Sequence, residues 1–223
     1  MPLPQTLRRL TPDRWRDDPR LRAVALGAGL IPPRTMHSGG EAATLARLAS
    51  GARRVVELGV YEGSSAVVLV QAMGPGSELV LVDPYSVETR WAALPQGAWA
   101  NATASRLAVA RARRSDGPTV RWILRRSQDV GRSWSGGPVD LVFIDGDHSY
   151  EGCRKDWEMW RAHVAPGGFA AFHDARAGQP GGRGAPGPTQ LVDETFRGAD
   201  ESGWTLADEI DALVVVRKQA RAG

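Results

Sequence analysis

The chain of 223 residues is long enough for one large domain, and its 42% hydrophobic content is ample for a packed core. Its 28 basic and 25 acidic residues nearly cancel, so the net charge of +3 gives little support to a polyanionic partner. The arginine-rich run at 111–114 keeps a nucleic acid open as a less favoured partner.

The cysteine content and the N-terminus together predict a cytoplasmic protein. The single cysteine, Cys153, excludes an intramolecular disulfide framework and fits a reducing compartment. No run approaches the ~20 apolar residues that span a bilayer, and the N-terminus is charged where a signal peptide is apolar. We therefore expect no membrane partner, while a homo-oligomer stays open.

Apolar, β-branched runs alternate with helical stretches, as is typical of a parallel α/β sheet. The first fifty residues read as helical with a break at 31–33. The predicted strands are residues 54–59, 78–83, 120–124, 140–145, 167–174, 204–207 and 213–217. The predicted helices are residues 64–73, 98–114, 150–164 and 190–197, with Ser149 as the N-cap of the third. The Gly- and Pro-rich residues 175–188 read as a mobile surface loop, which could close over an acceptor together with the segment from Trp91 to Trp99.

A glycine-containing turn follows the first predicted strand. Gly59 and Gly63 let the backbone turn tightly, and the following helix start presents free N–H groups to a ligand. Asp83 ends the second strand, where it can accept hydrogen bonds from ribose hydroxyls or simply cap the next turn. The glycine spacing does not fit the dinucleotide fingerprint, and Glu57 and Glu62 favour a cationic cofactor such as S-adenosylmethionine (SAM) over a pyrophosphate.

Acidic residues also follow the fourth and fifth predicted strands. If these strands are neighbours, ~4.8 Å apart in the sheet, Asp145 and Asp174 converge on one small volume. Two carboxylates are unfavourable there unless a proton or a cation lies between them, and a divalent ion is the natural candidate. The alternative is that the two residues are unrelated strand-end caps.

Two histidines lie beside these acids. His173 as a ligand would favour manganese or another transition ion, but strand alternation could equally turn it toward the helices. His148 is a candidate general base because imidazole titrates near neutrality; it could instead cap the helix or contact the cofactor. Asp147 could tune His148, add a ligand, or be a solvated turn residue.

These motifs together resemble the class I SAM-dependent methyltransferases. The residues that carry the resemblance are "ELGVYEGSS", Asp83, "RRSQDV" and "FIDGDHSYEG…PGGFAAFHD", between Val55 and about Asp174. The nearest family is methyltransferase family 24, whose small-molecule O-methyltransferases include macrocin- and sugar-modifying enzymes, with catechol O-methyltransferases more distant. The resemblance implies a Rossmann-like fold with a mostly parallel seven-stranded sheet and helices on both faces. It assigns residues 51–223 to a SAM-binding domain and residues 1–50 to a helical cap.

The resemblance also implies the site residues and the reaction. Cofactor contacts are assigned to Glu57, Gly59, Tyr61, Gly63 and Ser65 (methionine end), Asp83 (ribose), Ser127 and Gln128 (adenine), and Asp145. Metal ligands are Asp145, His173 and Asp174, with Mg²⁺ expected first and Mn²⁺ or another transition ion next. His148 takes the position of a base. The implied activity is metal-assisted O-methylation of a small-molecule hydroxyl on a sugar or another secondary metabolite. A catalytically silent SAM- or nucleotide-binding module and an RNA methyltransferase are the alternatives.

Overall fold

The computed structural model describes residues 18–85, 90–91, 94–95, 100–197 and 203–220. Strands of the main sheet are β1 (Arg54–Leu58), β2 (Glu78–Val82), β5 (Thr119–Ile123), β6 (Val139–Ile144), β7 (Val164–Phe172), β8 (Trp204–Ile210) and β9 (Leu213–Lys218). The helices are α3 (Pro19–Gly27), α4 (Gly39–Ser50), α5 (Ser64–Ala72), α6 (Ala102–Ala112), α7 (Ser127–Arg132), α8 (Tyr150–Trp160) and α9 (Pro186–Val192), followed by the π-helical turn η2 (Asp193–Arg197). A small hairpin pairs β3 (Arg90–Trp91) with β4 (Leu94–Pro95).

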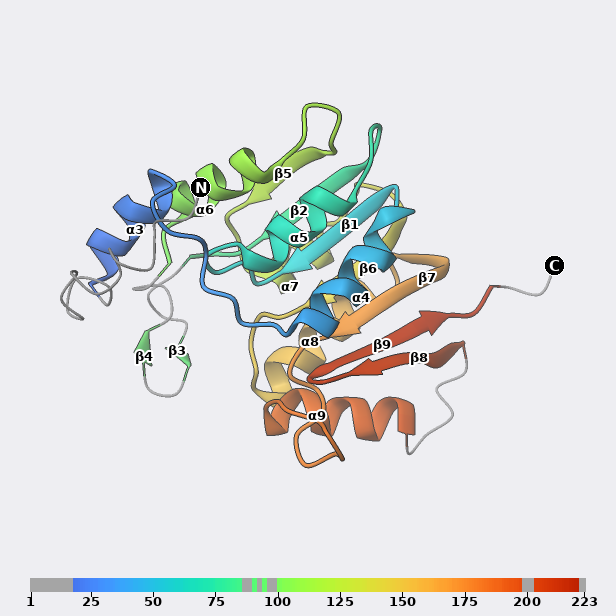
Figure 1. The fold of residues 1–223 in the computed structure, drawn as a ribbon. Coiled ribbons are helices and arrows are strands. Elements are labelled where there is room, and N and C mark those ends of the chain that lie inside the picture. The colour runs from blue at the N-terminus through green and yellow to red at the C-terminus, as the bar shows by residue number, and fades with distance from the viewer. Residues whose placement is uncertain (1–17, 86–89, 92–93, 96–99, 198–202, 221–223) are drawn as a thin grey trace.

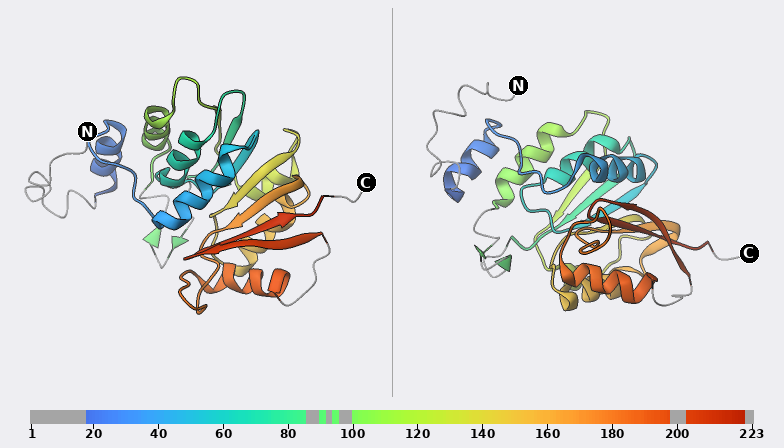
Figure 2. Two further views of the ribbon diagram at one scale, coloured as in Figure 1. Left: turned by 45° about the vertical axis from the view of Figure 1, so that its right-hand side comes forward. Right: turned by 60° about the horizontal axis from the view of Figure 1, so that its bottom comes forward.

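The seven strands are ordered β5-β2-β1-β6-β7-β9-β8, with helices covering both faces of the sheet (Figures 1 and 2). The pairs from β5 to β7 are parallel, whereas β9 runs antiparallel to β7 and β8. The strand order reverses beside β1, where the carboxyl ends of β1 and β6 lie together. In an open parallel sheet this reversal is the usual place for a ligand. The predicted fold class is confirmed.

The core lies in two layers, one on each face of the sheet. Alternate strand residues supply both layers: Val56 and Leu58 of β1 pack with the tryptophans of α8, while Val55 packs with α4 and α5. The strands β1, β2 and β6 are buried along nearly their whole length, as their continuous apolar runs predict. The apolar layers thus hold the strands rigidly and leave polar residues at their carboxyl ends.

The helix beginning at Tyr150 follows the predicted pattern as far as Trp160, whereas Val164, predicted within it, begins β7. Ser149 caps the helix by accepting a hydrogen bond from the backbone N–H of Gly152 at 3.0 Å. The buried face of α8 carries Cys153, Trp157 and Trp160, as the apolar spacing predicts. This cap fixes the point at which the chain leaves the β6 turn and therefore orients the residues of that turn.

Other boundaries differ from the prediction. β7 begins at Val164, so the Pro-Gly-Gly turn at 166–168 lies within the strand and coincides with a register shift against β6. The loop predicted to run to residue 188 ends earlier, because proline is tolerated in a first helical turn and α9 starts at Pro186. Within the loop, Ala175 bridges Gly184, which ties its two ends together. The helix α7 and the β3–β4 hairpin were not predicted.

The N-terminal helices α3 and α4 flank the predicted break at 31–33. The helix predicted over residues 98–114 is α6, which begins at Ala102 with Asn101 as its N-cap. The first residues of the predicted range, including Trp99, lie outside the described residues. In the described part of the chain, every helix is too short or too polar to cross a membrane.

Candidate active site at the carboxyl ends of the strands

The turn after β1 approaches the turn after β6 closely. Gly59 and Gly63 have φ values of 88° and 89°, in the left-handed region that favours glycine. A Cβ atom on Gly59 would lie 2.2 Å from the backbone oxygen of Asp145, so no larger residue fits without movement. The backbones of the predicted cofactor turn and the predicted metal-binding turn are therefore packed directly against each other.

Asp83 is held by the backbone of that turn. Its Oδ2 accepts hydrogen bonds from the N–H groups of Val60 at 2.8 Å and Tyr61 at 2.9 Å, and its Oδ1 accepts one from Tyr85 at 2.7 Å. The three bonds pin the turn, in which Tyr61 has a positive φ of 52°. A carboxylate offers about four acceptor positions, so Asp83 retains capacity for the predicted ribose contact.

Glu57 is fully buried beneath the same turn. The Ser65 hydroxyl donates a hydrogen bond to its Oε1, and its Oε2 is buried without a hydrogen-bond partner. Burial raises the pKa of Glu57 well above its ordinary value. The hydrogen bond from Ser65 lowers this pKa, whereas the charges of the nearby Asp145 and Asp83 raise it further. An open carboxylate oxygen in this position fits the positively charged end of SAM.

Glu62 does not support the same argument. Its carboxylate pairs with the Arg22 guanidinium of α3, with Nε at 2.5 Å from Oε1 and Nη2 at 2.6 Å from Oε2, and it accepts a bond from the Arg34 N–H at 2.7 Å. Its charge is therefore already compensated by the N-terminal segment. The sequence did not predict this pairing, because Arg22 lies 40 residues away from Glu62.

Ser127 and Gln128, the residues expected at the adenine, begin α7 and share one partner. The Ser127 hydroxyl and the Gln128 amide both donate to Oδ1 of Asp156 on α8, at 2.5 and 2.6 Å. Asp156 is completely buried, and its Oδ2 lacks a hydrogen-bond partner. Burial raises its pKa to about 7, against the opposing effect of Ser127. The sequence reading missed this residue.

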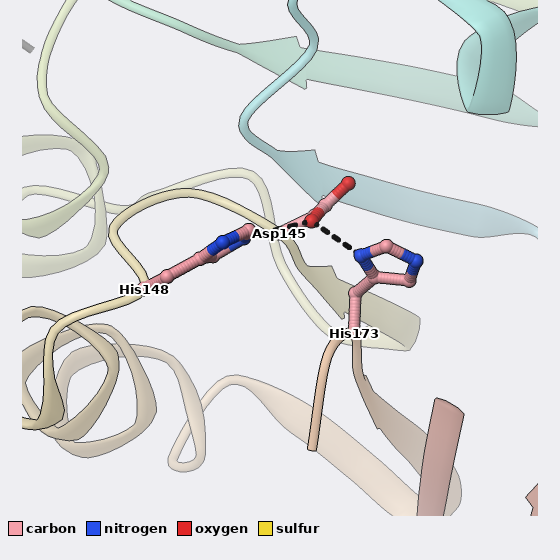
Figure 3. A group of neighbouring side chains, drawn as sticks. All are labelled: Asp145, His148 and His173. Atoms are coloured by element: carbon pink, nitrogen blue, oxygen red, sulfur yellow. Dashed lines mark hydrogen bonds and ion pairs between the residues drawn. The ribbon is translucent and has the colours of Figure 1, made fainter. Parts of the chain in front are cut away.

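Asp145, His148 and His173 converge where β6 and β7 end, as Figure 3 shows. Nδ1 of His173 lies 2.9 Å and Nε2 of His148 lies 3.2 Å from Oδ1 of Asp145. One ligand atom from each residue fits within 4.8 Å of the others, close enough for all three to bind a single ion. The register explains the meeting, because Ile144 pairs with Phe172 and the next residues on each strand are Asp145 and His173.

Asp174 approaches the same group from the other side. Its Oδ2 lies 3.4 Å from Nδ1 of His148 and 3.8 Å from Nδ1 of His173. Asp145 and Asp174 are thus brought together as predicted, and both carboxylates contact the imidazoles of His148 and His173. Asp147, in contrast, is exposed and accepts a hydrogen bond from the Ser149 N–H at 2.9 Å, which is the behaviour of a turn residue.

The charges of this cluster support one another. Burial by itself raises the pKa of Asp145, but His173 and His148 outweigh it and lower that pKa below its ordinary value. Burial lowers the pKa of His173, but Asp145 and Glu41 outweigh it and raise the value to about 11. The imidazoles therefore supply the positive charge that the two aspartates require. Nδ1 of His173 and Nδ1 of His148 face carboxylate oxygens of Asp145 and Asp174 respectively, and a divalent ion that took the place of the ring protons would fit this donor set.

Glu41 of α4 is a further residue of the cluster that the sequence reading missed. Its Oε2 lies 3.3 Å from Nε2 of His173, while its Oε1 accepts a bond from the Ala212 N–H at 2.7 Å. Glu41 also forms a capping box with Ser38. The motif Ser-x-x-Glu at 38–41 was the available signal. A carboxylate on the far nitrogen of a histidine is the usual way to orient a metal ligand.

Comparisons with known proteins agree with the fold. The family model described as a methyltransferase domain, family 24, matches residues 56–175, more than half of the chain. Cofactor-bound Rv0187 from MTB is 20% identical, with a TM-score of 0.62 and 92% of this chain and 91% of that chain covered. TomG, an O-methyltransferase from Streptomyces achromogenes solved with SAM, is 17% identical, with a TM-score of 0.58 and the same two coverages, 92% and 91%.

The O-methyltransferase from Bacillus cereus, solved in complex with SAH, is 17% identical, with a TM-score of 0.57 and 94% of this chain and 93% of that chain covered. At these identities the likeness to solved structures establishes a shared fold. No curated protein matches the sequence significantly.

Proposed function

The chain belongs to methyltransferase family 24 and is a class I SAM-dependent methyltransferase, and on this premise we propose that it methylates a hydroxyl oxygen of a small molecule with the help of a divalent metal ion. The acceptor class that we propose is a sugar or another secondary metabolite. The observation that supports the proposal is the cluster of Asp145, His148 and His173, with Asp174 beside it, which brings two carboxylates and two imidazoles together beside the cofactor turn.

The geometry supports a direct displacement. Because Gly59 packs against the backbone of Asp145, a methyl donor bound at the first turn would adjoin an acceptor bound at the second. SAM supplies the methyl group, and a divalent ion would lower the pKa of the acceptor hydroxyl and fix its oxygen. With SAM bound, the hydroxyl oxygen would bond to the methyl carbon as the carbon–sulfur bond breaks, the hydroxyl proton would pass to His148, and S-adenosylhomocysteine would leave.

The residues of the chain have separate parts in this reaction. Asp145, His173 and Asp174 would hold the ion, and His148 would accept the hydroxyl proton. Asp145 lies 3.2 Å from Nε2 of His148 and so stabilises the imidazolium that forms. Two oxygen donors suit Mg²⁺, whereas the imidazole of His173 favours Mn²⁺ or another transition ion.

The basic run at 111–114 supports a small acceptor over RNA. Arg111 donates to the backbone oxygens of Leu26 and Gly27 at 2.5 and 2.7 Å. Arg113 donates to Pro118, and Arg114 pairs with Asp116. The three arginine residues are exposed, but each guanidinium group makes a contact within the chain, which weakens the case for a phosphate-binding stripe.

Two measurements test the proposal in order. Calorimetric binding of SAM to the full chain comes first, and absence of binding would overturn the cofactor assignment. Turnover of a panel of hydroxylated sugars and aromatic metabolites then follows, with and without a chelator and with Mg²⁺ or Mn²⁺ added back. We expect turnover to stop with the chelator and to return with the ion; unchanged turnover would remove the metal.

A further inference from the structure

We propose that Asp156 is a positioning residue that sets the hydrogen-bonding polarity of the adenine end of the site, so that the site accepts a base bearing an amino group and rejects one bearing a carbonyl group. This inference rests on the proposed function, because it takes SAM as the ligand and Ser127 and Gln128 as its adenine contacts.

One buried oxygen joins the two predicted adenine contacts. Oδ1 of Asp156 accepts hydrogen bonds from the Ser127 hydroxyl at 2.5 Å and from the Gln128 side-chain amide at 2.6 Å. Asp156 has no exposed surface, so water does not compete for these two donors. Oδ1 accepts from both groups whether or not the other oxygen carries a proton.

The consequence is a fixed direction for both side chains. Because Oδ1 accepts here and carries no proton, the Gln128 amide nitrogen faces it, since a carbonyl oxygen cannot donate, and Oε1 of Gln128 is the end left for a ligand. The Ser127 proton is likewise directed to Asp156, which leaves lone pairs on the hydroxyl oxygen. Both side chains therefore present acceptors, and an acceptor selects a ligand that donates.

Packing places this group next to the cofactor turn. A Cβ atom on Gly146 would lie 3.3 Å from Oδ2 of Asp156, and a Cβ atom on Gly59 would lie 2.8 Å from Cα of Gly146. Gly59, Gly146 and Asp156 thus lie in succession from the first turn to the middle of α8. The exocyclic amino group of adenine is a donor that suits the acceptors of Ser127 and Gln128, whereas the carbonyl oxygen of hypoxanthine would face them unpaired.

The experiment compares two ligands that differ at this one group. S-adenosylhomocysteine and its deaminated analogue S-inosylhomocysteine are titrated calorimetrically into the full chain and its variants. We expect the wild type to prefer the adenosyl ligand by about 10- to 100-fold. Asp156→Ala frees both side chains to turn, so the preference should fall to about threefold or less. Asp156→Asn keeps an acceptor oxygen in the place of Oδ1 and should restore the preference.

Two further variants keep the test decisive. Asp129→Ala removes an exposed carboxylate from the same helix as Gln128 and should leave the preference unchanged. Gln128→Leu, at a half-buried position, should abolish the preference by itself if Asp156→Ala fails to fold. Equal binding of the two ligands by the wild type, or a full preference in Asp156→Ala, would overturn the role of Asp156. Failure of the wild type to bind either ligand would instead overturn the proposed function.

Discussion

The pKa values of buried carboxylates shift in opposite directions at the two ends of the candidate site. At the ends of β6 and β7, Asp145 faces two imidazoles, which outweigh burial and lower its pKa. Glu57 and Asp156 face mainly hydroxyl, amide and carboxylate groups, and there burial prevails and raises both pKa values. The neighbouring groups, more than burial, therefore decide which carboxylate keeps its charge. In the proposed function, the first end would hold the metal ion and accept the proton, and the second would recognise the ligand.

The sharpest test of this contrast removes the charge of Asp145. We expect Asp145→Asn to lower kcat by about 10³-fold or more, because the carboxylate serves both His148 and His173, and to lower the affinity for SAM by a much smaller factor, because Asp145 is also a predicted cofactor contact. Steady-state turnover and calorimetric SAM binding measure the two effects separately. Asp147→Asn, which changes an exposed carboxylate of the same turn, is the matched control. Turnover within tenfold of the wild type would contradict the assignment.

Replacing the proposed base should have the next largest effect. His148→Gln keeps a polar side chain but cannot accept the proton, and we expect kcat to fall by about 10²-fold. Binding of the metal ion and of SAM should change little if Asp145, His173 and Asp174 hold the ion. Loss of metal binding in this variant, measured by calorimetry with Mn²⁺, would show that His148 is a ligand.

Glu57 tests the other end of the site, where burial raises the pKa of a carboxyl group. Its raised pKa means that the free protein retains a proton that an ordinary glutamate would lose, and a bound cation would expel that proton. SAM affinity should therefore rise with pH through the shifted pKa. Binding enthalpies in buffers of different ionisation enthalpy report the released proton. Glu57→Gln should release no proton and should bind SAM about tenfold more weakly.

The strand ends could be predicted from the sequence because they depend on local patterns. Apolar runs and turn residues identify each strand, and parallel pairing then brings Asp145, His173 and Asp174 to one edge. The sequence could not show how the carboxylates would be paired. Glu62 meets Arg22 across 40 residues, and Glu41 meets His173 across 132, so these contacts depend on packing between distant segments.

Even so, two of the missed residues left a trace in the sequence. Glu41 completes the motif Ser-x-x-Glu of a capping box. Asp156 interrupts the buried face of α8, between Cys153 and Trp157, where an acidic residue is rarely placed without a partner. A charged residue on an apolar helical face is therefore worth treating as a candidate for a positioning role.

Glu41 should affect the metal end more weakly than the ligands do. Glu41→Gln preserves a group that can complete the capping box but removes the charge opposite Nε2 of His173. We expect the affinity of the metal-free protein for Mn²⁺ to fall by about tenfold, as is typical when a partner of a metal ligand is lost. Ser38→Ala removes the hydroxyl cap and leaves Glu41 charged, so it controls for destabilisation of α4. Equal affinity in Glu41→Gln and the wild type would contradict this role.

Replacing Asp156 should produce the smallest effect. The pKa of Asp156 shifts upward, opposite to that of Asp145, so its effect on stability with pH distinguishes the two ends of the site. Its pKa of about 7 in the folded chain exceeds the ordinary 3.8, so the folded protein holds a proton that the unfolded chain releases. This contribution to the free energy of unfolding is full below about pH 4, declines as the pH rises, and is lost above about pH 7.

Asp156→Asn cannot titrate and should lack this decline. Relative to the wild type, the variant should therefore gain stability between pH 5 and pH 8, by roughly 1–2 kcal/mol, because the wild type must desolvate a charge that asparagine does not carry. Urea unfolding across that range measures the difference between the two proteins, in which the titration of other groups cancels. Asp129→Asn, an exposed change on α7, should run parallel to the wild type. Parallel curves for Asp156→Asn would mean that Asp156 is charged in the folded chain, like Asp145.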